Sequence, residues 1–126
     1  MSRKILYMSL ISLLIYTQAT AATTNTVPYL SEHELHQKLQ GYIDRVNQTK
    51  AVLDDAVIEP SVKEQQQALC QRIDAYQNIV KLSNEYPEFE SASVMKIAAL
   101  HYLKRQKESF DTSGLNQKAF CLADHQ

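Results

Sequence analysis

The side chains with the most evident potential for chemistry are histidines near the start and middle of the chain. His33 and His36 lie three positions apart, whereas the zinc-protease pattern H-E-x-x-H places its histidines four apart. Residues three apart still share a helix face, so the spacing permits a weak transition-metal site. His101 stands alone in an apolar stretch and could join His36 as a metal or haem ligand inside a helical bundle.

A simpler interpretation explains the same histidines without any ligand. His33 and His36 fit the solvated first turn of a helix, and a lone histidine on an apolar face is more often a hydrogen-bonded boundary residue. The pattern C-x-x-C-H, which attaches c-type haem, does not occur in the sequence. We therefore expect no cofactor and no bound metal, with His33, His36 and His101 as weak candidate ligands.

The sequence also lacks patterns that supply a nucleophile or bind phosphate. It contains no G-x-S-x-G and no glycine-rich phosphate loop, and it has only two glycines. A small enzyme would need Arg45, Arg72, a carboxylate and His101 to converge on one cavity. We expect a protein that is not an enzyme.

The N-terminal segment has the order of a secretory signal peptide. Arg3 and Lys4 precede an apolar run from Ile5 to Tyr16, and Ala19-Thr20-Ala21 forms an A-x-A cleavage site. The apolar run is shorter than the roughly 20 residues that cross a bilayer as a helix. We predict that residues 1–21 are a cleaved signal peptide, with cleavage after Ala22 as the alternative, and that 22–30 form a flexible lead. The mature protein is expected to be periplasmic or secreted, with no stable membrane anchor.

Export changes the interpretation of the two cysteines. Cys70 and Cys121 are the only pair in the chain, and an oxidising compartment favours a disulfide between them. Such a bond would close a loop of about 50 residues, which the chain-entropy model values at roughly 4 kcal/mol. Neither residue lies in a C-x-x-C pattern, so a redox or metal-binding thiol is disfavoured.

The charge of the mature chain argues against nucleic acid as a partner. Of 13 basic and 14 acidic residues, the signal peptide removes two basic ones, leaving 11 against 14 and a formal net charge of −3. Nucleic acid and anionic membranes both reward clustered Lys and Arg, and the one basic cluster, Lys104, Arg105 and Lys107, is explained by the dipole at the end of the third predicted helix. The remaining class of macromolecular partner is another protein.

Capping signals divide the mature chain into helices. Ser31 with Glu34, and Ser61 with Glu64, have the spacing of a capping box and predict two helix starts. Pro60 ends the first helix at about Glu59, and the second runs from Ser61 to about Ser83. A third helix starts between positions 87 and 93, breaks at 111–114, and is followed by a short segment at 115–122. We predict an all-α antiparallel bundle of three long helices plus a short C-terminal helix, forming one domain over 31–126.

Apolar periodicity predicts which side of each helix faces the core. In the first helix, the residues expected to face the core recur at alternating steps of four and three. Thr49 is the least apolar of these positions, and Val57 extends the apolar surface to one side. In the second helix one stripe spans about 60°. Its members are Val62, Leu69, Ile73, Tyr76 and Val80. The third helix carries two stripes and should be the most enclosed or have a second partner, which permits a homodimer. These stripes are Val94, Ile97, Ala98 and His101, and then Met95, Ala99, Tyr102, Leu103 and Phe110.

The turn between the second and third helices is the best candidate for a protein-binding site. Tyr86 and Phe89 flank Pro87, and Glu85, Glu88 and Glu90 surround them, as aromatic anchors with a polar rim do at interfaces. The alternative is that both aromatics fold back and cap the core. We predict an exported, non-enzymatic protein-binding module, such as an inhibitor or immunity protein against a toxin or enzyme. The second hypothesis is a bundle that binds a small molecule, metal or haem through His36 and His101.

Overall fold

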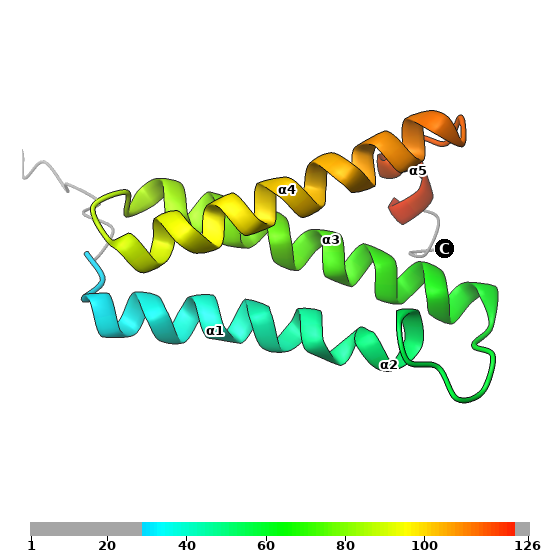
Figure 1. The fold of residues 1–126 in the computed structure, drawn as a ribbon, viewed down its shortest axis with the longest axis horizontal. Helices are drawn as coiled ribbons and strands as arrows, with labels where there is room; N and C mark the ends of the chain where they lie inside the picture. The colour runs from blue at the N-terminus through cyan, green and yellow to red at the C-terminus, as the bar shows by residue number, and fades with distance from the viewer. Residues whose placement is uncertain (1–28, 123–126) are drawn as a thin grey trace, which may run out of the picture.

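Residues 29–122 are described by the computed structural model, and all regular structure in that range is helical. Three long helices, α1 (Glu32–Gln48), α3 (Val62–Glu85) and α4 (Glu90–Thr112), pack against one another, with α3 and α4 crossing so that the start of α4 lies beside α1 (Figure 1). Two short helices, α2 (Lys50–Leu53) and α5 (Gln117–Leu122), lie toward one end of the bundle (Figure 1). The predicted all-α bundle of three long helices and a short C-terminal helix is confirmed. The expected signal peptide lies outside the described residues.

Both predicted capping boxes form. At the start of α1, the Ser31 hydroxyl accepts from the Glu34 backbone N–H at 3.3 Å, and the Glu34 carboxylate accepts from the Ser31 backbone N–H at 2.9 Å. Ser61 and Glu64 repeat this arrangement before α3, at 3.2 and 2.8 Å. Hydrogen bonds from the serine hydroxyls, and then from their backbones, hold the pKa of both glutamates below the usual range. The two helix starts are thus fixed by local chemistry.

The first helix ends earlier than predicted. α1 stops at Gln48, α2 adds one turn as far as Leu53, and the chain then leaves helical geometry well before Pro60. Val57, which we expected to widen the helical stripe, is 99% exposed. The physical reason is a tertiary contact, because Asp54 leaves the helix to pair with Arg72 on α3.

The core is built from side chains of all three long helices. Leu35 and Leu39 of α1 pack with Ile79 and Leu82 of α3, and three of these four have no exposed surface. Ala92 and Ala99 of α4 complete this cluster, together with Tyr86. Small side chains let helix axes approach closely, so the alanines bring α4 against α3.

The predicted orientation of α3 is only partly right. Ile73 is buried, but Leu69, Tyr76 and Val80 are half-buried, and Val62 is 82% exposed. The most buried positions lie roughly a third of a turn away on the helix surface. These positions are Ala68, Ala75, Ile79 and Leu82. The difference arises because α3 packs against both α1 and α4, so it buries two arcs where the periodicity showed one.

One side of α4 faces the core and the other faces solvent. The stripe that includes Ala99 and Phe110 is buried or half-buried, whereas Val94 and Ile97 of the other stripe are 60% and 69% exposed. Of the two alternatives expected for this helix, that it is the most enclosed is therefore wrong, and that it has a second partner stays a prediction. Within residues 29–122, no other helix covers its second stripe.

The C-terminal segment folds back onto α3. The chain turns at Gly114, whose φ of 68° lies in the left-handed region that glycine adopts without steric cost. Cys121 of α5 forms the predicted disulfide with Cys70 of α3, with 5.6 Å between the two Cα atoms. Gln66 donates a hydrogen bond to the Phe120 carbonyl, and the Phe120 ring lies edge-on to Phe110 at 5.4 Å.

In the described part of the chain, none of the helices combines the length and the hydropathy that a membrane span requires.

We predict that removing the disulfide with Cys70→Ala and Cys121→Ala lowers the free energy of unfolding by about 4 kcal/mol, because a 51-residue separation is no longer closed. α5 has no buried residue of its own, so it should lose its attachment to α3. Urea unfolding gives the first quantity, and amide hydrogen exchange of 117–122 gives the second. A double variant that keeps wild-type stability and α5 protection would contradict this.

Candidate functional surfaces

The three candidate histidines are all exposed. His33 lies within hydrogen-bonding distance of Gln37, with 3.0 Å between their Nε2 atoms. His36 lines a depression between α1 and α4, and His101 lies on the solvent side of α4. Within residues 29–122, no group of three or more His, Cys, Asp or Glu side chains is placed to hold a metal ion. The structure therefore gives the metal and haem hypothesis no preformed ligand set among these residues.

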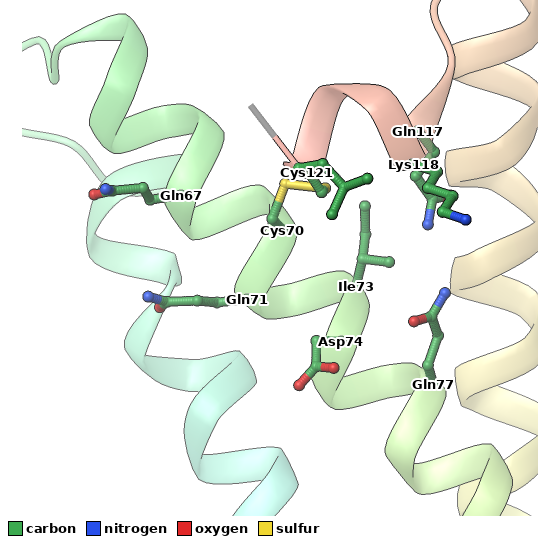
Figure 2. A pocket seen from close by; sticks show the side chains of 10 residues that line it. Gln67, Cys70, Gln71, Ile73, Asp74, Gln77, Gln117, Lys118 and Cys121 are labelled. Atoms are coloured by element: carbon green, nitrogen blue, oxygen red, sulfur yellow. A yellow bond between two sulfur atoms is a disulfide. The ribbon is translucent and has the colours of Figure 1, made fainter. Parts of the chain in front are cut away.

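The disulfide borders a pocket of about 630 Å³ between α3 and α5 (Figure 2). Gln67, Gln71, Asp74 and Gln77 line it from α3, and Gln117 and Lys118 line it from α5 (Figure 2). Among the described residues of this lining, Asp74 is the one carboxylate, and it accepts a hydrogen bond from the side-chain amide of Asn78 at 3.1 Å. Amides and a bonded disulfide offer hydrogen bonds to a polar ligand, but they supply no activated nucleophile.

The strongest polar cluster is organised around Arg72, which is 9% exposed. Its Nε donates to the Thr49 hydroxyl at 2.6 Å, and its two terminal nitrogens donate to the Asp54 carboxylate at 3.1 and 2.6 Å. This two-point contact matches the planar geometry of a guanidinium and a carboxylate. Thr49 in turn donates to the Val46 carbonyl at 2.7 Å, so its hydroxyl both donates and accepts a hydrogen bond within the fold.

The protonation states of this cluster are coupled. The hydrogen bonds from Arg72 hold the pKa of Asp54 below its usual range, and the same contact raises the pKa of Arg72. Burial raises the pKa of Tyr102, and the neighbouring Arg72 cation offsets part of that rise. The Tyr102 ring stacks on Tyr76 with 4.3 Å between centroids. These pKa directions keep Asp54 anionic, Arg72 cationic and Tyr102 neutral at neutral pH, which suits a structural role.

The pairing of Arg72 with Asp54 was not predicted from the sequence, where we named Arg72 only among the four groups that a small enzyme would need. Thr49 was the available signal, since a hydroxyl at an apolar seam position often marks a buried polar partner.

The structure does not assemble the four groups that an enzyme would need. Arg72 is paired with Asp54, while the Arg45 guanidinium lies over the Tyr42 ring at 5.6 Å from its centroid. His101 is exposed on α4. Ser93 and Lys96 have the S-x-x-K spacing found around some nucleophilic serines, but Ser93 is exposed and neither residue lines the adjacent depression between α1 and α4.

In the turn between α3 and α4, Tyr86 is a core residue. It is 5% exposed, its hydroxyl accepts from the Leu30 backbone N–H at 3.3 Å, and its ring packs on Tyr29 at 5.3 Å. Phe89 is half-buried beside it, with 6.4 Å between the two ring centroids. Tyr29 and Leu30, expected in the flexible lead, therefore cover this turn.

The rest of that turn is accessible. Pro87 and the three glutamates are exposed. Protein binding by Pro87, Phe89, Glu85, Glu88 and Glu90 stays a prediction, whereas Tyr86 would be accessible only if Tyr29 moved aside.

Two other surfaces carry large exposed apolar side chains. The first, here called the apolar loop, is the segment 55–60 between α2 and α3, where Val57 and Ile58 are 99% and 85% exposed. Val62, the first residue of α3, lies close to it in the chain and is 82% exposed. The second is the solvent side of α4, with Val94 and Ile97. We had assigned Val57 and Val62 to buried stripes, and the structure corrects both.

No family model, no curated protein and no solved structure matches this chain. Function must therefore be argued from these surfaces alone.

We predict that Asp54→Asn destabilises the fold by about 1–2 kcal/mol at pH 7, because it removes the charged partner of Arg72. Solvent screens part of the attraction, since the Asp54 side chain is 44% exposed. Folding lowers the Asp54 pKa, so the stabilisation is complete above the unfolded value of about 3.9 and is lost as the pH falls through the folded value.

The measurement is urea unfolding of both proteins between pH 2 and pH 7. The difference between them should shrink toward zero in acid. Asp55→Asn is the matched control, because it makes the same charge change one residue away at an exposed position. An equal difference at pH 2 and pH 7 would show that the ion pair is not its source.

Proposed function

We propose that this protein is an exported, non-enzymatic protein-binding module, of the kind that inhibits or neutralises a toxin or an enzyme. The observation that carries the proposal is the apolar loop, where two consecutive aliphatic residues, Val57 and Ile58, have almost no cover. Isolated exposed apolar residues are common, but adjacent ones with a third nearby are typical of an interaction site.

The apolar loop is held at both ends, which favours binding. Before it, Asp54 is paired with Arg72, and after it, Ser61 forms the capping box that starts α3. A segment whose ends are fixed loses less conformational entropy when a partner binds. Burial of Val57 and Ile58 would contribute about 1.5–3 kcal/mol each.

Charge around the apolar loop indicates the kind of partner. Asp55 and Glu59 are exposed on either side of Val57 and Ile58, and the predicted mature chain is acidic overall. A partner with an apolar pocket bordered by Lys or Arg would complement this surface.

Export is part of the proposal and rests on the signal sequence together with the disulfide. Disulfides persist in oxidising compartments, and Cys70–Cys121 is formed in this fold. Arg3 and Lys4, the apolar run and the A-x-A site together form a signal sequence that would direct the chain into the secretory pathway.

We predict that the full-length chain, expressed in a Gram-negative host, yields a periplasmic protein beginning at Ala22 or Thr23. Intact-mass analysis of the periplasmic fraction identifies the first residue of the mature chain and shows whether both cysteines are oxidised. A cytoplasmic product that keeps residues 1–21 and has reduced cysteines would contradict export.

The binding surface is tested with a photoreactive amino acid at position 57. In the periplasmic or extracellular fraction of the native host, we expect cross-links to one defined protein, which is then purified. Val57→Asp with Ile58→Asp should weaken its binding by at least roughly 100-fold, because two apolar anchors worth about 1.5–3 kcal/mol each are lost. The thermal midpoint should stay unchanged, because both side chains are exposed.

Leu115→Asp is the matched control, since Leu115 is 51% exposed in a different loop and receives the same chemical change. Binding that survives the double substitution, or that Leu115→Asp weakens equally, would contradict a role for the apolar loop.

A further inference from the structure

The solvent side of α4 carries an apolar stripe with a defined length. Val94 and Ile97 are 60% and 69% exposed, and Ala98 and His101 are exposed on the same side. At 100° per residue these four positions fall within a sector of about 100°. Near Glu90 and Val94 this side of α4 borders α1 across the depression that Glu32 and His36 line, and farther along the chain α4 diverges from α1 (Figure 1).

A charged residue lies at each end of this stripe. Glu90 is one turn before Val94 and Arg105 is one turn after His101, on the same side of the helix. Lys104 and Lys107 form ion pairs with Glu108 and Asp111 in the next turn. In contrast, no salt bridge joins Glu90 or Arg105 to any residue in the described range 29–122.

We propose that this side of α4 is the seam of a symmetric homodimer, in which two α4 helices pack antiparallel around a twofold axis between Ile97 and Ala98. In this register Ile97 lies opposite Ala98 of the second copy, and Val94 lies opposite His101 of the second copy. The same register places Glu90 opposite Arg105 of the second copy, so two ion pairs close the ends of the seam.

The charges select this orientation over the parallel one. Parallel packing would put Glu90 against Glu90 and Arg105 against Arg105, which repel. Antiparallel packing also brings Arg105 of the second copy to the depression lined by Glu32, Glu90 and Val94, where both carboxylates are exposed. A twofold axis makes the same surface self-complementary, as an isologous interface requires.

The seam is short, so the dimer is weak. The distance along α4 from Glu90 to Arg105 is about 22 Å at 1.5 Å per residue. A two-helix seam of this length is smaller than a standard interface of about 1,600 Å². We expect a dissociation constant on the order of 10–100 μM.

Sedimentation equilibrium of the oxidised protein, purified after expression of the full-length chain, tests the proposal from 5 μM to 1 mM. Arg105→Glu should weaken dimerisation roughly tenfold, because each of two attractions becomes a repulsion. Adding Glu90→Arg to that variant should restore the wild-type constant, because the charges are exchanged across the same register.

Lys107→Glu is the matched control, since it makes the same charge change on α4 but away from the stripe and should leave the constant unchanged. Ile97→Asp should abolish dimerisation while the helical circular dichroism is kept, because Ile97 is exposed in the monomer. A wild-type protein that is monomeric at 1 mM would overturn the proposal. That result is expected if the apolar stripe of α4 binds a different protein or a lipid surface instead. The proposal would also be overturned if Arg105→Glu left the dissociation constant unchanged, or if adding Glu90→Arg to that variant did not restore the wild-type constant.

Discussion

The arrangement of this bundle depends on the contacts that the Arg72 guanidinium makes. A cation that is 9% exposed must be paired, and its hydrogen bonds go to Thr49 at the end of α1 and to Asp54 beyond α2. Tyr102 of α4 lies beside the same group. One side chain of the central helix thus joins the chain segments on both of its sides, and it fixes where the first helical segment must end. The apolar loop follows from that ending, because residues after Asp54 can no longer continue a stripe against the core.

Features set by neighbouring residues could be predicted from the sequence. The capping boxes need only a serine and a glutamate three residues later, and the turn at Gly114 needs only a residue that tolerates positive φ. The disulfide was predictable because Cys70 and Cys121 have no other partner in the chain. Features set by tertiary contacts were not predictable in this way. The periodicity of α3 marked Leu69 and Val80, yet two neighbouring helices compete for its surface, and only their positions decide which arc is buried.

The candidate surfaces show the same difference between features set by neighbouring residues and features set by tertiary contacts. Aromatic residues beside a proline suggested an exposed anchor, but Tyr86 satisfies its hydroxyl with the Leu30 backbone and packs its ring under Tyr29. Conversely, Val57 and Val62 are aliphatic like core residues but are exposed. Val57 lies in a segment that is not helical, and Val62 is the first residue of α3, beyond the part of that helix that is packed. An aliphatic residue carries no local mark that separates a core position from a binding position. The surfaces that now carry the functional argument could therefore be found only from the fold.

The two proposed contact surfaces lie on different parts of the molecule, and this has a consequence for binding. The apolar loop is at the end of the bundle where α2 meets α3, whereas the α4 stripe runs along one edge (Figure 1). Pairing through α4 would therefore leave both copies of Val57 and Ile58 accessible. A weak dimer presenting two identical loops binds a dimeric or surface-immobilised partner with an affinity gain set by effective concentration rather than by new contacts. A monomeric partner gives no such gain, so sensitivity of binding to Arg105→Glu would reveal the valency of the partner as well as the role of the seam.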